Sequence, residues 1–228
     1  MKSASHHAMG YLLFSALERE GVLLNREQFV LGNLLPDYLP ELILAPHFTL
    51  KCQREIGLFT GVLAAQRISA GAELPPDYSL RLGILCHYIT DYFCFAHSRA
   101  FPQNLARHSS YEQALDGYFR DHYSAGECLL PVAANLQAAS AKDAVQEIFR
   151  IKRDYKAAER CFQTDVQYAF SVCLGAIRMM LALSSAAQKP VRMALLFSPF
   201  TAKRFAFQSD VRRKTIVPRR AWCTSLIA

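Results

Sequence analysis

The stretch His87-Tyr-Ile-Thr-Asp91 lies near the middle of the 228-residue chain and is followed by His97 and by His108-Ser-Ser-Tyr-Glu112. His87 and Asp91 are four positions apart, as are His108 and Glu112, so on α-helices each pair shares one face. Imidazole and carboxylate are the ligands that zinc takes in catalytic centres. The spacing therefore predicts helices that present metal ligands to one another.

Further residues of the same chemical types lie upstream. They are His6, His7, His47, and Asp37 at the end of Gly32-Asn-Leu-Leu-Pro-Asp37. Of the seven histidines, only His122 has no obvious place in this pattern. Burying several carboxylates together without cations would be costly, and bound metal removes that cost. The set is therefore typical of a multinuclear metal site.

The position of His97 favours more than one ion. If the central helix runs on through His97, this residue lies roughly 9 Å further along the axis than Asp91 and points away from it. We therefore expect His87 and Asp91 to hold a first ion with Asp37 and His47. His97, His108 and Glu112 would hold a second, and Asp91 could bridge to a third held by the N-terminal histidine. Zinc, as two to three ions, is the expected cofactor.

A single motif of this kind would carry little weight. One histidine on an apolar helix face is more often a hydrogen-bonded core residue than a ligand. The HxxxD and HxxxE spacings are each weak on their own. The joint pattern HxxxD-x5-H-x10-HxxxE, preceded by Pro-Asp and a further histidine, is much more specific.

The order and spacing of these residues resemble the zinc-dependent phospholipase C family, which includes secreted bacterial enzymes and the catalytic domain of clostridial alpha-toxin. The resemblance runs from His6 to Glu112. It implies that Asp37 is both a ligand and the general base, and that Asp91 is the bridging carboxylate. It further implies these ligands: His6 or His7, His47, His87, His97, His108 and Glu112.

The chain departs from that family at its start. Secreted members bind zinc through the amino group and carbonyl of an N-terminal tryptophan, whereas this chain begins Met1-Lys2 and its one tryptophan is Trp222. The related single-strand-specific zinc nucleases have a similar HxxxD-x5-H run. Their last pair ends in Asp, so Glu112 favours the phospholipase side.

The sequence predicts an all-α fold, a multi-helix bundle of the phospholipase C and zinc nuclease type. Helical patterns cover residues 6–20, 26–34, 50–70, 77–97, 109–123, 141–156 and 160–185, with Ser109 or Ser110 as the cap of the fifth. No window alternates with a period of two residues. Residues 1–188 are expected to form the catalytic domain, and residues 189–228 a basic, partly disordered extension.

Composition limits the class of protein. With 52% hydrophobic and 20% charged residues, the chain is long enough for one sizeable core. It has no run of about 18 apolar residues, which predicts no transmembrane segment. No secretory signal is visible, so the default location is cytoplasmic. Seven cysteines without a CxxC pair do not suggest a disulfide framework.

The expected function is hydrolysis of phosphodiester bonds in phospholipids, with a metal-activated water as nucleophile. The alternatives are a single-strand nuclease-like zinc phosphodiesterase and a non-catalytic metal-binding helical protein. The net charge of +7 is concentrated after Lys189. Such a basic tail suits peripheral contact with anionic membranes and, equally, nucleic acid.

Overall fold

The computed structural model describes residues 1–38, 49–69, 71–102, 104–123 and 136–186. His47 and residues 189–228 lie outside these ranges. Chain contacts divide the protein into a unit over Met1–Lys189 and another over Pro190–Ala228, and every described residue belongs to the first.

The described residues form α-helices and one 3₁₀ helix, and none of them is in a strand, so the all-α prediction is confirmed. The elements are α1 (Ser3–Arg19), α2 (Arg26–Tyr38), α4 (Thr49–Ala64), α5 (Pro76–Tyr92), η1 (Phe95–His97), α6 (Leu105–Tyr123), α7 (Ala141–Ala157) and α8 (Phe162–Ala186). All seven predicted helical segments correspond to an observed helix.

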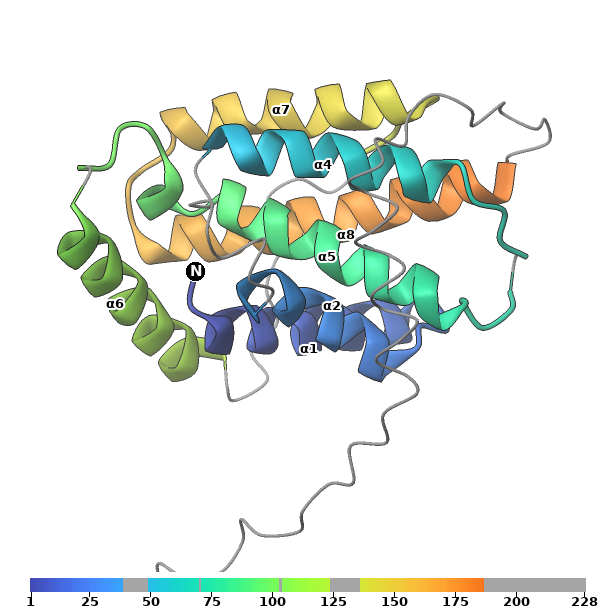
Figure 1. Ribbon diagram of the computed structural model, residues 1–228, viewed down its shortest axis with the longest axis horizontal. Helices are drawn as coiled ribbons and strands as arrows, with labels where there is room; N and C mark the ends of the chain where they lie inside the picture. The colour runs from blue at the N-terminus through green and yellow to red at the C-terminus, as the bar shows by residue number, and fades with distance from the viewer. Residues whose placement is uncertain (39–48, 70, 103, 124–135, 187–228) are drawn as a thin grey trace, which may run out of the picture. The chain divides into compact units, whose positions relative to one another are not determined.

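Helix α5 runs through the middle of the bundle. It lies between α4 and α7 on one side and α1 and α2 on the other, with α8 behind it (Figure 1). From Tyr78 to Tyr92 every residue except Arg81 is buried, as expected for a helix that neighbours surround. Pro76 in the first turn and Asp77 beside the helix N-terminus define its start. The His87–Asp91 pair of α5 is thus held in the core.

Helices α2 and α5 approach one another at backbone contact. A Cβ atom added to Gly32 would lie 2.1 Å from the carbonyl oxygen of Leu80, and one added to Gly83 would lie 2.2 Å from that of Phe29. Both distances are far shorter than any real carbon–oxygen contact, so only glycine fits on either side. This close approach brings the C-terminal half of α2 against the ligand-bearing half of α5.

Four predicted helix boundaries are wrong by four residues or more. Helix α4 ends at Ala64, whereas the prediction ran to residue 70. The central helix ends at Tyr92 rather than 97, because the backbone N–H of Phe95 donates to the carboxylate of Asp165 instead of a helical carbonyl. Helix α6 begins at Leu105, where the Asn104 side chain accepts from the N–H of Arg107, so neither Ser109 nor Ser110 is the cap. Helix α2 continues through Pro36, whose ring already has a helical φ.

Helix α8 is long and apolar enough, by length and composition, to cross a membrane. However, 67% of its apolar window is buried inside the bundle, as in the core helix of an all-α domain. The composition predicted no transmembrane segment, and the described residues contain one helix that is a weak candidate. Of the described cysteines, Cys52, Cys86, Cys94 and Cys173 are buried, Cys161 is half-buried, and all five are free thiols.

Replacing Gly83 with alanine tests the contact between α2 and α5. We expect Gly83→Ala to lower the free energy of unfolding by about 1–3 kcal/mol, because the methyl group forces the helix backbones apart. The matched controls are Gly57→Ala and Gly61→Ala on α4, where an added Cβ meets no atom within 4 Å. These should be neutral or stabilising by up to about 1 kcal/mol. Urea unfolding of the three variants gives the comparison, and equal stability would contradict the packing argument.

Candidate metal centre

Helix α5 places His87 and Asp91 on one face, with His87 Nε2 at 3.5 Å from Asp91 Oδ2. Both side chains are fully buried. The Nδ1 atom of His87 lies 2.8 Å from the backbone carbonyl of Asn33 on α2. A carbonyl only accepts, so Nδ1 carries the proton and donates, which leaves the Nε2 lone pair facing the cluster. This arrangement is typical of histidines that bind metal.

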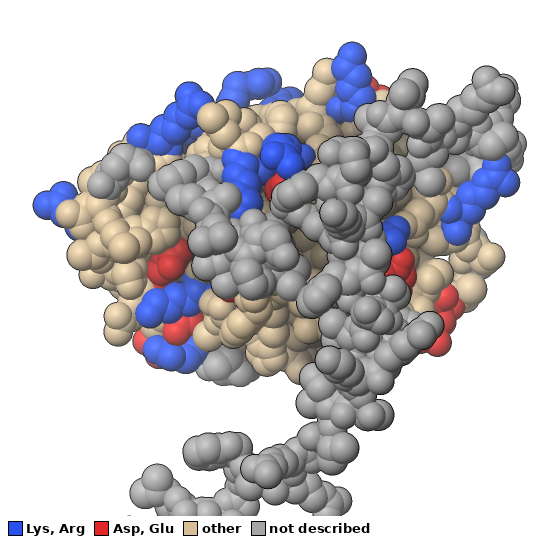
Figure 2. All heavy atoms as spheres, in the orientation of Figure 1, with Lys and Arg blue, Asp and Glu red and all other residues tan. Residues whose placement is uncertain are grey.

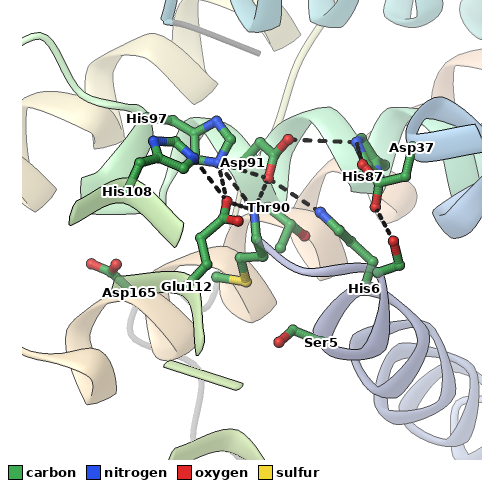
Figure 3. Close-up of polar contacts among 12 residues, drawn as sticks. Ser5, His6, Asp37, His87, Thr90, Asp91, His97, His108, Glu112 and Asp165 are labelled. Carbon is green, nitrogen blue, oxygen red and sulfur yellow. Dashed lines mark hydrogen bonds and ion pairs between the residues drawn. The ribbon is translucent and has the colours of Figure 1, made fainter. Parts of the chain in front are cut away.

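Helix α1 adds His6 to the same cluster (Figure 3). Its Nε2 atom lies 3.1 Å from Asp91 Oδ1, and its ring stacks on that of His87 at 3.9 Å between centroids. Burial, and then the neighbouring His87, lower the pKa of His6 to about 4, so the ring is neutral at physiological pH. His7 is exposed and contacts the ring of Tyr11. Of the two candidate histidines, the structure therefore brings only His6 to the cluster.

A second group of donors forms around Glu112 on α6. Its Oε1 atom lies 2.9 Å from His97 Nε2 and 3.1 Å from His108 Nε2. His97 Nε2 also lies 3.5 Å from Asp91 Oδ1. Each triad, His6–His87–Asp91 and His97–His108–Glu112, has ligand atoms within 4.8 Å of one another. Asp91 belongs to the first triad, and its contact with His97 connects that triad to the second.

The expectation that His97 points away from Asp91 is wrong. It assumed that the helix continues to residue 97, whereas α5 ends at Tyr92 and Cys94 is extended. The chain then turns through η1, which directs His97 back toward the end of α5. The grouping of His97 with His108 and Glu112 agrees with the sequence prediction, although the reason given for it did not hold.

Asp37 lies at the edge of the cluster, near the end of α2. Its Oδ1 atom is 3.8 Å from His87 Nε2, and its Oδ2 accepts a hydrogen bond of 2.8 Å from Ser3 Oγ. The side chain is 19% exposed, more than any member of the first triad. It is close enough to join that triad and has contact with solvent. His47, the other ligand predicted for this ion, lies outside the described residues.

The α-amino group of Met1 lies between the two triads, and the spacing pattern did not predict it. It forms an ion pair with Asp91, lies 3.2 Å from Glu112 Oε1, and is 3.1 Å from His97 Nε2. Burial raises the pKa of Glu112, but the ammonium group and His97 outweigh burial and hold that pKa far below its usual range. The cluster therefore attracts a cation and keeps Glu112 ionised.

The donor set fits zinc. It combines imidazole nitrogens with carboxylate oxygens, directed inward from α1, α5, η1 and α6. The orientation of His87 is set by a backbone acceptor, as for a metal-bound imidazole. The Nδ1 atom of His6 is buried without a hydrogen-bond partner among the described residues. The buried Asp91 and the half-buried Glu112 in one cluster also need positive charge nearby.

Asp165 on α8 supports the second triad from behind, and no sequence motif identified it. Its carboxylate accepts from the backbone N–H of Phe95 at 2.8 Å, the hydroxyl of Tyr111 at 3.0 Å and the hydroxyl of Tyr155 at 2.6 Å. Phe95 begins the turn that carries His97, and Tyr111 precedes Glu112. Asp165 thus joins the two segments that supply the second triad.

We expect Asp165→Asn to weaken zinc binding at the second triad by roughly 10–100-fold, the usual effect of changing a group that orients metal ligands. The asparagine side chain has one oxygen that accepts hydrogen bonds, whereas the carboxylate has two. It therefore cannot accept all three of these bonds in the same arrangement. Tyr155→Phe is the control, because it removes one bond to Asp165 and keeps those to Phe95 and Tyr111. Zinc titration with a competing chelator gives both site affinities. Equal weakening of both sites would point to general destabilisation.

The comparisons with known proteins agree with this geometry. The family model described as zinc dependent phospholipase C matches residues 4–168, which is well over half of the 228 residues and spans every described candidate ligand. No curated protein and no solved structure matched. The resemblance drawn from the spacing of the histidines and acids is thereby confirmed. The chain belongs to the zinc-dependent phospholipase C family.

Proposed function

We propose that this protein hydrolyses the phosphodiester bond of phospholipids, in the manner of a phospholipase C, with a zinc-activated water as nucleophile. The observation that carries the proposal is the position of Asp91. Its two oxygens face both triads, with Oδ1 3.1 Å from His6 and 3.5 Å from His97, and Oδ2 3.5 Å from His87. A carboxylate in this position would let two metal ions act on one phosphate group.

In this proposal His6, His87 and Asp91 hold one ion, and His97, His108 and Glu112 hold a second. His47 remains a proposed ligand outside the described residues. Bound zinc would supply a Lewis acid for the phosphate oxygens and lower the pKa of a coordinated water. The neutral state of His6 and the ionised state of Glu112 suit these residues to that task. No protein nucleophile is required.

Asp37 is the proposed general base. Its hydrogen bond from Ser3 Oγ orients the carboxylate, and its partial exposure leaves it accessible to water and substrate. The 3.8 Å separation from His87 Nε2 places it beside the first triad. Asp37 would take the proton of the attacking water, which needs an ionised carboxylate within hydrogen-bond reach.

The substrate test compares two phosphodiesters. We expect zinc-loaded protein to hydrolyse a short-chain phosphatidylcholine and to leave a single-stranded oligonucleotide intact. Asp37→Asn should retain zinc and lose roughly 10²–10⁴-fold in turnover, because an amide cannot accept the proton. Asp121→Asn, the same change at an exposed position on α6, is the control. Hydrolysis of the oligonucleotide alone would favour a nuclease, and no turnover would favour a non-catalytic metal protein.

Removing the bridging carboxylate should affect both ions. We expect Asp91→Ala to lower zinc stoichiometry and abolish turnover, and to lose the rise in melting temperature that zinc gives the wild type, since metal binding is coupled to folding. Asp116→Asn is the matched control, because this buried carboxylate accepts from Ser5 Oγ and lies outside both triads. Full zinc stoichiometry in Asp91→Ala protein would exclude the bridging role.

The basic extension is proposed to act at membranes rather than in catalysis. All the proposed ligands precede residue 113, so protein lacking residues 189–228 should keep its zinc and its turnover of soluble substrate. We expect it to adsorb less to vesicles of anionic lipid, and the difference should shrink at high salt, which screens such attraction. Vesicle sedimentation at two salt concentrations measures this. Equal adsorption would leave the extension without a membrane role.

A further inference from the structure

A cavity of ≈ 380 Å³ lies apart from the metal centre, between the start of α4, the segment after η1 and the C-terminal part of α7. Four of the residues that line it are cations, and none is acidic: Arg99, Lys152, Lys156 and Arg160. None of the lining residues belongs to either metal triad. In Figure 2 several Lys and Arg side chains lie along the upper edge, over α4 and α7, where few acidic side chains are visible.

Lys152 is the buried cation of this cavity, with 3% of its surface exposed. Its Nζ donates to the backbone carbonyl of Tyr92 and lies 3.9 Å from the ring centroid of Tyr155. No carboxylate of a described residue forms an ion pair with it. Burial lowers the pKa of Lys152 to about 7, in spite of Asp165 behind Tyr155, which raises it. A buried ammonium without a paired anion is unfavourable, and an anionic ligand would relieve this.

Two further groups add hydrogen-bond donors. The Arg160 guanidinium lies over the rings of Phe95 and Tyr155, at 4.9 Å and 5.5 Å, and donates to the carbonyl of Lys156. Those ring contacts fix the orientation of the guanidinium plane. The other N–H groups of the guanidinium remain available to a ligand. The Oγ atom of Ser98 is buried and has no hydrogen-bond partner among the described residues. An unsatisfied buried hydroxyl that lines a cationic cavity is suited to an oxyanion.

We propose that this cavity binds a phosphate monoester. Arg99, Lys156 and Arg160, together with Lys152 once a nearby anion favours its charged form, call for a ligand with more than one negative charge. A phosphate monoester carries about −1.5 to −2 at neutral pH. Guanidinium forks match the spacing of phosphate oxygens, and an ammonium adds a point charge. The group could belong to a free phosphorylated molecule or to the head group of phosphatidic acid. The proposal stands whether or not the metal centre is a phospholipase.

The test variant is Lys156→Gln/Arg160→Gln, in full-length, zinc-loaded protein. The control is Lys142→Gln/Arg153→Gln, which removes the same charge from α7 at positions outside the cavity. Glycerol 3-phosphate binding is measured by calorimetry at about 0.15 M salt. We expect the test variant to bind roughly tenfold more weakly or worse, as when charge-assisted hydrogen bonds are lost. The control should bind like the wild type, and zinc content should not change.

Lys152→Met checks the buried cation separately, since methionine keeps most of the apolar stem. A normal melting temperature with weaker glycerol 3-phosphate binding supports the proposal. A second arm compares vesicles of phosphatidylcholine with vesicles containing phosphatidic acid. Selective loss of phosphatidic acid binding in the test variant identifies a lipid head group, and loss of glycerol 3-phosphate binding alone identifies a free ligand. Equal binding by the wild type and both double variants, or equal loss in both, overturns the proposal.

Discussion

Two carboxylates, the buried Asp91 and the half-buried Glu112, lie close together, and the arrangement around them follows from the cost of removing them from water. Ionised groups removed from water need opposite charge and hydrogen bonds, or they become protonated. Here imidazoles from α1, α5, η1 and α6 and the amino group of Met1 surround them. The site therefore favours cations, in agreement with the zinc dependence of the family.

A few packing contacts outside the cluster hold its side chains in position. Backbone contact between Gly32 and Gly83 lets α2 place Asn33 against His87 and Asp37 at the edge of the cluster. At the other end, Asp165 takes the N–H of Phe95 out of the helix. The end of α5 is thus a tertiary effect, and it is what turns His97 toward Asp91. Rigid elements, rather than long loops, hold the described donors.

The cationic cavity and the metal centre share one segment of chain. Ser98 and Arg99 line the cavity directly after His97, whose carbonyl accepts a hydrogen bond of 2.9 Å from Thr49 Oγ1. Lys152 donates to the carbonyl of Tyr92, the residue next to Asp91. The segment from Tyr92 to Arg99 therefore contacts both sites. The two sites differ in charge. The carboxylates of the metal centre suit cations, and the cations that line the cavity suit an anion.

The sequence by itself determined the helical class and the ligand chemistry. The pairs His87–Asp91 and His108–Glu112 were predictable because positions i and i+4 of a helix share a face whatever the helix packs against. The set combines imidazole with carboxylate, and this ligand chemistry pointed to zinc without any knowledge of the packing. Between His6 and His7 the sequence left the ligand open. In the structure His6 is buried in the cluster, while His7 is exposed.

Only the tertiary structure decided how these pairs meet. The contact between His97 and Asp91, the position of the Met1 amino group and the role of Asp165 all join segments far apart in the chain. Such contacts depend on how helices cross and where they stop. Local periodicity carries no information about either, and a strong helical pattern over 77–97 even predicted the wrong end. That end was decided by a carboxylate 70 residues away in the sequence, which competes for one backbone N–H.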